Sequence, residues 1–127
     1  MTTRITLIAL LAGTTLLGLG CTTTQINPGT ETSATYRYGT LDATLNAAMD
    51  TTYNATDRAT QGLGLSVVQR LQDKLESQIV ARDAQDRKIT IIMLSVAADK
   101  TKLTIKAEPE SKATRIYQTI LDELAKK

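Results

Sequence analysis

The 127-residue sequence predicts an α+β domain, in which an antiparallel sheet of about four to five strands has two helices packed on one face. Residues 101–107 alternate apolar with polar side chains, which is the pattern of a half-buried strand. An apolar stripe with helical spacing closes the chain after Pro109, and glycines at 62 and 64 end an earlier helical segment. The expected element order is β-α-β-β-β-β-α or β-α-β-β-β-α, preceded by a signal peptide and a flexible tether.

Residues 1–20 have the features of a secretory signal peptide. One basic residue, Arg4, precedes an apolar run over residues 5–19, which as a helix would reach only about 22 Å. This is short of the roughly 30 Å hydrocarbon core of a bilayer, so the run is a poor membrane span. Small residues end the run, and cleavage is therefore expected between Gly20 and Cys21.

Residues 17–21, Leu-Gly-Leu-Gly-Cys, resemble the lipobox of bacterial lipoproteins, with the leucine one position further from the cysteine than is usual. The resemblance implies that Cys21 carries a diacylglyceryl thioether and, after cleavage, a further acyl chain on its amine. Two or more acyl chains anchor a protein stably, so the expected membrane contact is through Cys21. The alternative is an ordinary signal that leaves a free thiol. Thr22 replaces the Asp of inner-membrane retention, which implies the bacterial outer membrane, with the domain facing the periplasm.

Composition limits the classes of function. The 15 basic and 13 acidic residues give a net charge of +2, from which we expect no nucleic-acid partner. Cys21 is the single cysteine and histidine is absent, which excludes a disulfide in the domain and a zinc site built from cysteine and histidine. We expect no metal and no cofactor. Phe and Trp are also absent, so the core must be aliphatic.

The mature chain divides into a tether and one domain. Residues 21–33, which begin with the lipidated cysteine, are rich in Thr and are expected to form the tether. The domain is expected over residues 34–127. In it, residues 35–41 alternate β-forming residues and predict the first strand, with Tyr36 and Tyr38 available to pack.

A first helix is expected from Asp50, as its N-cap, to about Gln61. Residues 66–83 then fit two readings, because Val68, Leu71 and Leu75 have helical spacing while the flanking residues alternate as in strands. Periodicity alone leaves both readings open.

The remaining elements have clearer patterns. Residues 88–96 are rich in β-branched side chains, and a tight connection at residues 98–100 joins them to the alternating strand that follows, which predicts a hairpin. The final helix has Glu110 early and lysines late, as the helix dipole favours, with expected ion pairs Asp122/Lys126 and Glu123/Lys127. Its apolar stripe consists of Ala113, Ile116, Tyr117, Ile120, Leu121 and Leu124.

Landmarks in order along residues 35–124 resemble a family of small bacterial lipoproteins catalogued as a domain of unknown function. They are Tyr38-Gly39-Thr40-Leu41, Ala55 and Ala59 before Gly62-Leu63-Gly64-Leu65, Ser77-x-Ile79-x-Ala81-x-Asp83, Lys88-Ile89-Thr90-Ile91 and Thr101-x-Leu103-x-Ile105. The resemblance implies strand, helix, three or four antiparallel strands and helix, which favours strands for residues 66–83. Thr52 and Tyr53 depart from the apolar residue and the tryptophan of that pattern. The family has no established activity, so no catalytic residue carries over.

The residues also predict that the protein is not an enzyme. Its serines lie in no nucleophile motif, and the glycines at 62 and 64 precede no phosphate-binding helix. The acid pairs Asp83/Asp86 and Glu108/Glu110 flank expected turns, where carboxylates are usually solvated.

One sheet face is expected to carry apolar residues on the side away from the helices. If Ile89, Ile91 and Met93 face the helices, the candidate partner surface on the opposite face consists of Val80, Ile92, Leu94 and Val96. Equally, the tether could fold over this strand, with Ile26 or Tyr36 as its cover. Lysines at 100, 102 and 106 could meet anionic headgroups, although a solvated sheet face is the commoner reading.

We therefore expect a membrane-anchored envelope lipoprotein, a non-enzymatic interaction or assembly module whose partner is another envelope protein or a second copy. The alternative is a periplasmic carrier that binds a small apolar ligand between the sheet and the C-terminal helix.

Overall fold

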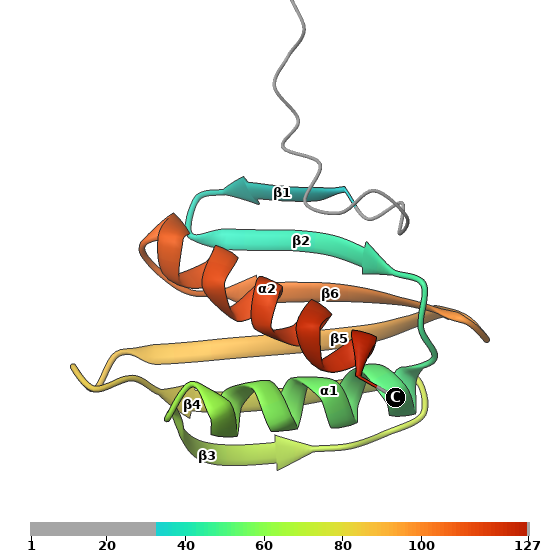
Figure 1. The fold of residues 1–127 in the computed structure, drawn as a ribbon, viewed down its shortest axis with the longest axis horizontal. Helices are drawn as coiled ribbons and strands as arrows, with labels where there is room; N and C mark the ends of the chain where they lie inside the picture. The colour runs from blue at the N-terminus through green and yellow to red at the C-terminus, as the bar shows by residue number, and fades with distance from the viewer. Residues whose placement is uncertain (1–32, 127) are drawn as a thin grey trace, which may run out of the picture.

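The computed structural model describes residues 33–126, which form an open six-stranded antiparallel sheet with both helices on one face (Figure 1). The order of strands across the sheet is β1-β2-β6-β5-β4-β3. The α+β fold with two helices on one face is thereby confirmed. The elements are β1 (Ala34–Arg37), β2 (Thr40–Leu45), α1 (Met49–Gly62), β3 (Ser66–Leu71), β4 (Glu76–Arg82), β5 (Lys88–Ala97), β6 (Lys100–Lys106) and α2 (Glu110–Ala125).

The first expected strand is in fact a hairpin, which accounts for the additional strand. Tyr38 and Gly39 both have positive φ, +49° and +77°, and form a two-residue turn between β1 and β2. Tyr36 lies opposite Leu41 across this turn, so both side chains face the core although they are five positions apart, and the inward-facing positions change from even numbers in β1 to odd numbers in β2. Tyr36 packs against the core, whereas Tyr38 is fully exposed, contrary to the expectation that both pack.

Residues 66–83, for which the periodicity allowed either a helix or strands, form strands β3 and β4, as the family resemblance implied. A bulge between Val67 and Gln69 shifts the register of β3 against β4. The bulge leaves Val68 exposed and interrupts the two-residue period, which explains why periodicity failed here. β3 is an edge strand of the sheet.

The core lies between the sheet and the two helices and is aliphatic apart from two tyrosines. On the sheet it includes Ile79, Ile91 and Met93, each 0% exposed, and on α2 it uses the predicted stripe except Leu124, which packs at its margin. α1 contributes small residues, of which Ala55, Ala59 and three threonines are also 0% exposed. Thr56 satisfies its hydroxyl by donating to the carbonyl of Thr52 at 2.8 Å.

Two predictions about helix ends are wrong. Ala48, not Asp50, is the N-cap of α1, because the chain must turn helical early enough to bury Met49, and Asp50 lies in the first turn. At the other end of the domain, Lys126 follows α2 with an extended backbone and pairs with Glu123 at 2.8 Å rather than with Asp122. Lys127 lies outside the described residues.

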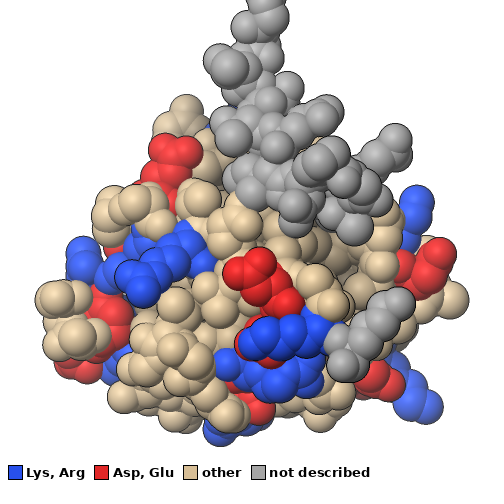
Figure 2. All heavy atoms as spheres, in the orientation of Figure 1, with Lys and Arg blue, Asp and Glu red and all other residues tan. Residues whose placement is uncertain are grey.

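The helix-bearing side of the molecule has charges of both signs interspersed with neutral residues (Figure 2). Two ion pairs on it connect elements that are distant in sequence. Arg58 of α1 pairs with Glu123 of α2 at 3.1 Å, and Arg70 of β3 pairs with Asp57 of α1 at 2.9 Å. Exposed pairs of this kind stabilise a fold only slightly, so they orient α1 more than they stabilise the domain.

Candidate functional site

The predicted partner surface lies on the helix-free face of the sheet. β5 is central there, with Ile92 opposite Gln78 and Thr104, and Leu94 opposite Glu76 and Lys102. Each apolar side chain thus has polar neighbours on both adjoining strands. The apolar surface is therefore a single row along β5.

The four predicted residues differ in how accessible they are. Val80 lies opposite Thr90 on this same face but is only 5% exposed. Ile92 is half-buried, whereas Leu94 and Val96 are 36% and 56% exposed. Val96 sits at an irregularity between Ser95 and Ala97 in the pairing of β5 with β6. The accessible part of the surface is consequently its Leu94–Val96 end, and Val80 contributes little.

Two further leucines lie at this end of the sheet and were not assigned to a surface from the sequence. Leu71 is the last residue of β3 and Leu75 lies just before β4, and they are 52% and 74% exposed. The backbone N–H of Ser95 donates to the carbonyl of Leu75 at 2.9 Å, which holds the β3–β4 connection beside the end of β5. We refer to Leu71, Leu75, Leu94 and Val96 as the apolar end cluster.

The apolar end cluster has lysines and acids of similar number around it. Lys102 lies opposite Leu94, Lys74 is exposed in the β3–β4 connection, and Lys100 begins β6. Within residues 33–126 these three ammonium groups form no ion pair. The acidic residues of the same turns and strand ends are Asp73, Glu76 and Asp99.

The opposite end of the sheet is organised by Asp83, which follows β4. Its carboxylate accepts from the backbone N–H groups of Gln85 and Arg87 at 2.9 and 2.8 Å, and from Arg87 Nε at 3.1 Å. It also pairs with Lys112 of α2. The Lys112 hydrogen bond, followed by the backbone bond from Arg87, holds the pKa of Asp83 far below its usual range. Asp83 is therefore a fixed anion that ties the β4–β5 loop to α2.

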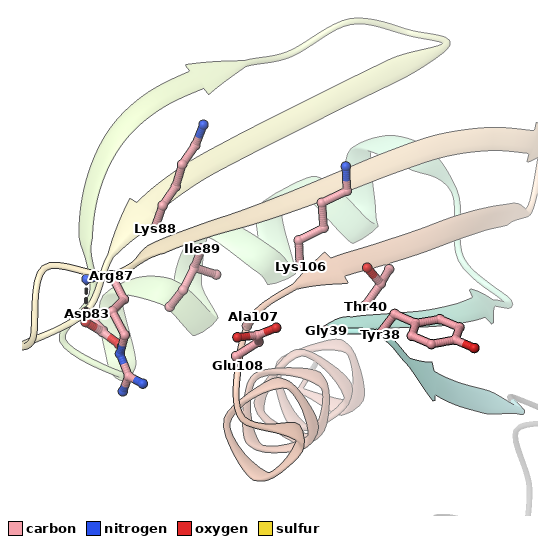
Figure 3. A pocket seen from close by; sticks show the side chains of 10 residues that line it. All are labelled: Tyr38, Gly39, Thr40, Asp83, Arg87, Lys88, Ile89, Lys106, Ala107 and Glu108. Carbon is pink, nitrogen blue, oxygen red and sulfur yellow. Dashed lines mark hydrogen bonds and ion pairs between the residues drawn. The ribbon is translucent and has the colours of Figure 1, made fainter.

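A cleft of about 430 Å³ lies beside Asp83 and is shown in Figure 3. Lys88 and Lys106 line it with their side chains directed away from α2, while Glu108 lies near the turn at Gly39.

Tyr36 is tied to the segment before α2. Its hydroxyl donates to the carbonyl of Ala107 at 3.2 Å, and burial, followed by the nearby charges of Glu108 and Glu110, raises its pKa.

In the acid pairs considered from the sequence, Asp83, Asp86 and Glu108 each lie next to groups other than their pair partner. Asp83 is engaged as described, and the side chain of Asp86 is 84% exposed and lies 3.7 Å from Arg82. Glu108 precedes α2 and Glu110 begins it, and Glu108 is instead close to Gly39. Asp83 and Asp86 are therefore not a pair of carboxylates arranged for acid–base chemistry.

A second cleft, of about 560 Å³, lies where the end of α1, the β4–β5 loop and the start of α2 meet. Its apolar residues are Leu63, Leu65, Pro109 and Ile116, and its basic residues are Arg87, Lys112 and Arg115. It opens at the start of α2 and not between the middle of this helix and the sheet, where the side chains form the packed core.

Several predicted features lie outside the described residues, including Gly20, Cys21 and Ile26. Tyr36 shares the face of Leu41, toward the helices, and so does not cover the helix-free face. Within residues 33–126, no helix is both long and apolar enough to cross a membrane. The same residues contain no group of three or more metal-ligating side chains of the His, Cys, Asp or Glu type.

Comparison with known proteins places the chain in a family without assigning it an activity. No curated protein matches it. A family model matches residues 4–118, which include the apolar N-terminal run, Cys21, all six strands and the first half of α2. The chain therefore belongs to the family described as protein of unknown function (DUF3568).

Proposed function

We propose that this protein is a lipoprotein of the bacterial cell envelope, anchored in the outer membrane through lipidated Cys21 and facing the periplasm. The observation that supports this most directly is the extent of the family match, which begins at residue 4 and so includes the signal-like run and the cysteine along with the folded domain. The basic start, apolar middle and small-residue end of this run are those of a signal peptide, and its inclusion in the family pattern supports export to the cell envelope.

Within the envelope, we propose that the domain is a non-enzymatic interaction or assembly module. The accessible apolar row on β5 supports this, because contiguous exposed apolar surface marks contact sites. The contacts of Asp83 support this proposal as well. Its carboxylate is buried and already pairs with Arg87 and Lys112, so it is not free to act as a general acid or base.

The anchor is tested by expressing the full-length protein with an alkyne fatty acid and fractionating the cells. We expect the wild-type protein to be labelled and to sediment with outer membranes, and Cys21→Ser to lose the label and leave the membrane fraction. Thr22→Asp is the matched variant, since it should keep the label and move to the inner membrane. An unlabelled wild-type protein would contradict the proposal.

The interaction module is tested by in-cell photocrosslinking from position 92, with position 106 as the control on the same sheet face. A discrete adduct at position 92 alone would identify an envelope protein or a second copy as the partner. Equal labelling from both positions, or from neither, would contradict a specific contact on this row.

The second candidate function is a periplasmic carrier for a small apolar ligand, and the 560 Å³ cleft at the start of α2 is the observation that favours it. Apolar walls with a basic rim would suit an acyl chain with an anionic end. Native mass spectrometry of the purified protein should then show co-purified lipid, which Leu65→Lys, at a partly buried position of the cleft wall, should abolish. Lipid-free wild-type protein would exclude this candidate.

A further inference from the structure

The apolar end cluster lies at the same end of the sheet at which the chain enters the domain. β1 begins at Ala34, which pairs with Ala43 near the end of β2, and β2 ends with Leu45 opposite Thr101 at the start of β6. The β5–β6 connection is therefore at this end, as are the last residue of β3 and the β3–β4 connection that precedes β4 (Figure 1). The Asp83 clefts are at the other end.

We infer that the apolar end cluster rests on the surface of the bilayer that anchors Cys21, with Leu75 and Val96 entering the interfacial region. This inference depends on the proposed lipid anchor. It assigns lipid headgroups and the first methylenes of the acyl chains to the exposed residues beside the two chain reversals, Leu71, Leu75 and Val96, and leaves the β5 row around Ile92 to the proposed partner.

The length of the tether is the first argument for this orientation. Residues 22–33 can reach at most about 40 Å when fully extended. The ten residues of β5 alone cover roughly 33 Å along the sheet. If the Asp83 end faced the membrane, the tether would have to run back along the whole sheet and would use most of its reach. With the apolar end cluster toward the membrane, the chain enters the domain from the membrane side without that extension.

The character of the two ends is the second argument. At the membrane-facing end, the large apolar side chains of two adjacent chain reversals are more than half exposed, at Leu75 and Val96. At the opposite end, Asp83, Arg87 and Lys112 tie down the β4–β5 loop, and the exposed side chain of the β1–β2 turn, Tyr38, carries a polar hydroxyl. Leucine and valine side chains can enter the interfacial region while the backbone of the turns stays among the hydrated headgroups, because its unpaired N–H and C=O groups would be costly in the hydrocarbon core.

Charge adds little to the contact. Lys74, Lys100 and Lys102 are offset by Asp73, Glu76 and Asp99 at the same end. We therefore expect the apolar side chains to determine the contact, in anionic and in zwitterionic membranes alike.

The test uses the full-length lipidated protein reconstituted in vesicles of phosphatidylethanolamine and phosphatidylglycerol. Because Cys21 is the only cysteine and lipidation consumes its sulfur, an introduced cysteine supplies the one free thiol for an environment-sensitive fluorophore. Leu75→Cys and Val96→Cys place the probe in the apolar end cluster. Tyr38→Cys is the control, because Tyr38 is fully exposed at the opposite end of the same sheet.

We expect the probe at positions 75 and 96 to shift to shorter wavelength and to be quenched several-fold more by brominated lipid than the probe at position 38. Vesicles of phosphatidylcholine should give the same ranking. Protein that floats with the vesicles while all three probes remain equally aqueous would overturn the inference and leave the anchor intact. A response that requires anionic lipid would also overturn it, by assigning the contact to the lysines. Loss of flotation in the wild-type protein would instead contradict the lipid anchor.

Discussion

Lys112 on α2 pairs with the Asp83 carboxylate, whose side chain is only 5% exposed at the end of β4. The two residues are 29 positions apart in the chain, so this contact depends on the docking of α2 against the β4–β5 loop. Asp83 in addition orders its own loop through the backbone N–H groups of Gln85 and Arg87.

Replacement of Asp83 by Asn should lower the thermal unfolding midpoint clearly, because the amide cannot pair with both Lys112 and Arg87. Asp86→Asn is the matched control in the same loop, with an 84% exposed side chain, and should shift the midpoint much less. Differential scanning calorimetry of both variants measures the difference. Equal midpoints would show that the Asp83 contacts are not important for the fold.

The same contacts predict loss of stability in acid. The pKa values of Asp83 and Glu123 are both lowered in the folded protein, by Lys112 and by Lys126 respectively as the largest cause. Their stabilisation is therefore present above the unfolded-state pKa of about 4 and is lost as the pH falls below it toward the folded-state values. Urea unfolding followed from pH 7 to pH 2 should show this fall, and it should be smaller in Asp83→Asn. A fall of the same size in that variant would assign the acid sensitivity to other carboxyl groups.

Alanine substitution at three glycines should change the stability of the domain in three different ways. Gly39 has φ +77° and a Cβ there would lie 2.7 Å from Glu108 Oε1, so Gly39→Ala should cost roughly 1–2 kcal/mol in backbone strain and more through the contact. Gly64, at φ +70° with open space around it, should show the backbone cost alone. Gly62, in α1 with no strained φ and no near neighbour, should gain about 0.4–1 kcal/mol. Chemical denaturation of the three variants checks this ranking.

Tyr36→Phe should destabilise the domain by about 0.5–1.5 kcal/mol, because the hydroxyl donates to the Ala107 carbonyl and links β1 to the segment before α2. Tyr38→Phe, at a fully exposed position, is the control and should be neutral. A neutral Tyr36→Phe would mean that water replaces the lost hydrogen bond.

Ile92→Lys should separate binding from folding on the helix-free face. The side chain is half-buried between polar neighbours and a lysine can extend its charge to solvent, so we expect a stability loss of less than about 1 kcal/mol. The apparent size of the protein on gel filtration and the envelope phenotype should nevertheless change. An unchanged size and an unchanged phenotype would place the partner surface elsewhere.

Local pattern was sufficient for the elements whose period is uninterrupted. The stripe of α2, the β5–β6 hairpin and the placement of both helices on one sheet face followed from alternation and helical spacing. The pattern failed at two places where the backbone departs from its period, the two-residue turn at Tyr38-Gly39 and the bulge after Val67, and each of them shifts the alternation of side chains.

By itself, the sequence determined the α+β class, the aliphatic core and the C-terminal helix, because these follow from side-chain chemistry repeated at a fixed spacing along the chain. Only the tertiary structure decided that Asp83 meets Lys112 and that Leu71, Leu75, Leu94 and Val96 gather at one end. Those relationships depend on the strand order β1-β2-β6-β5-β4-β3 and on the register between strands. Strand order and register are set by packing of the whole sheet against both helices, which no short stretch of sequence encodes.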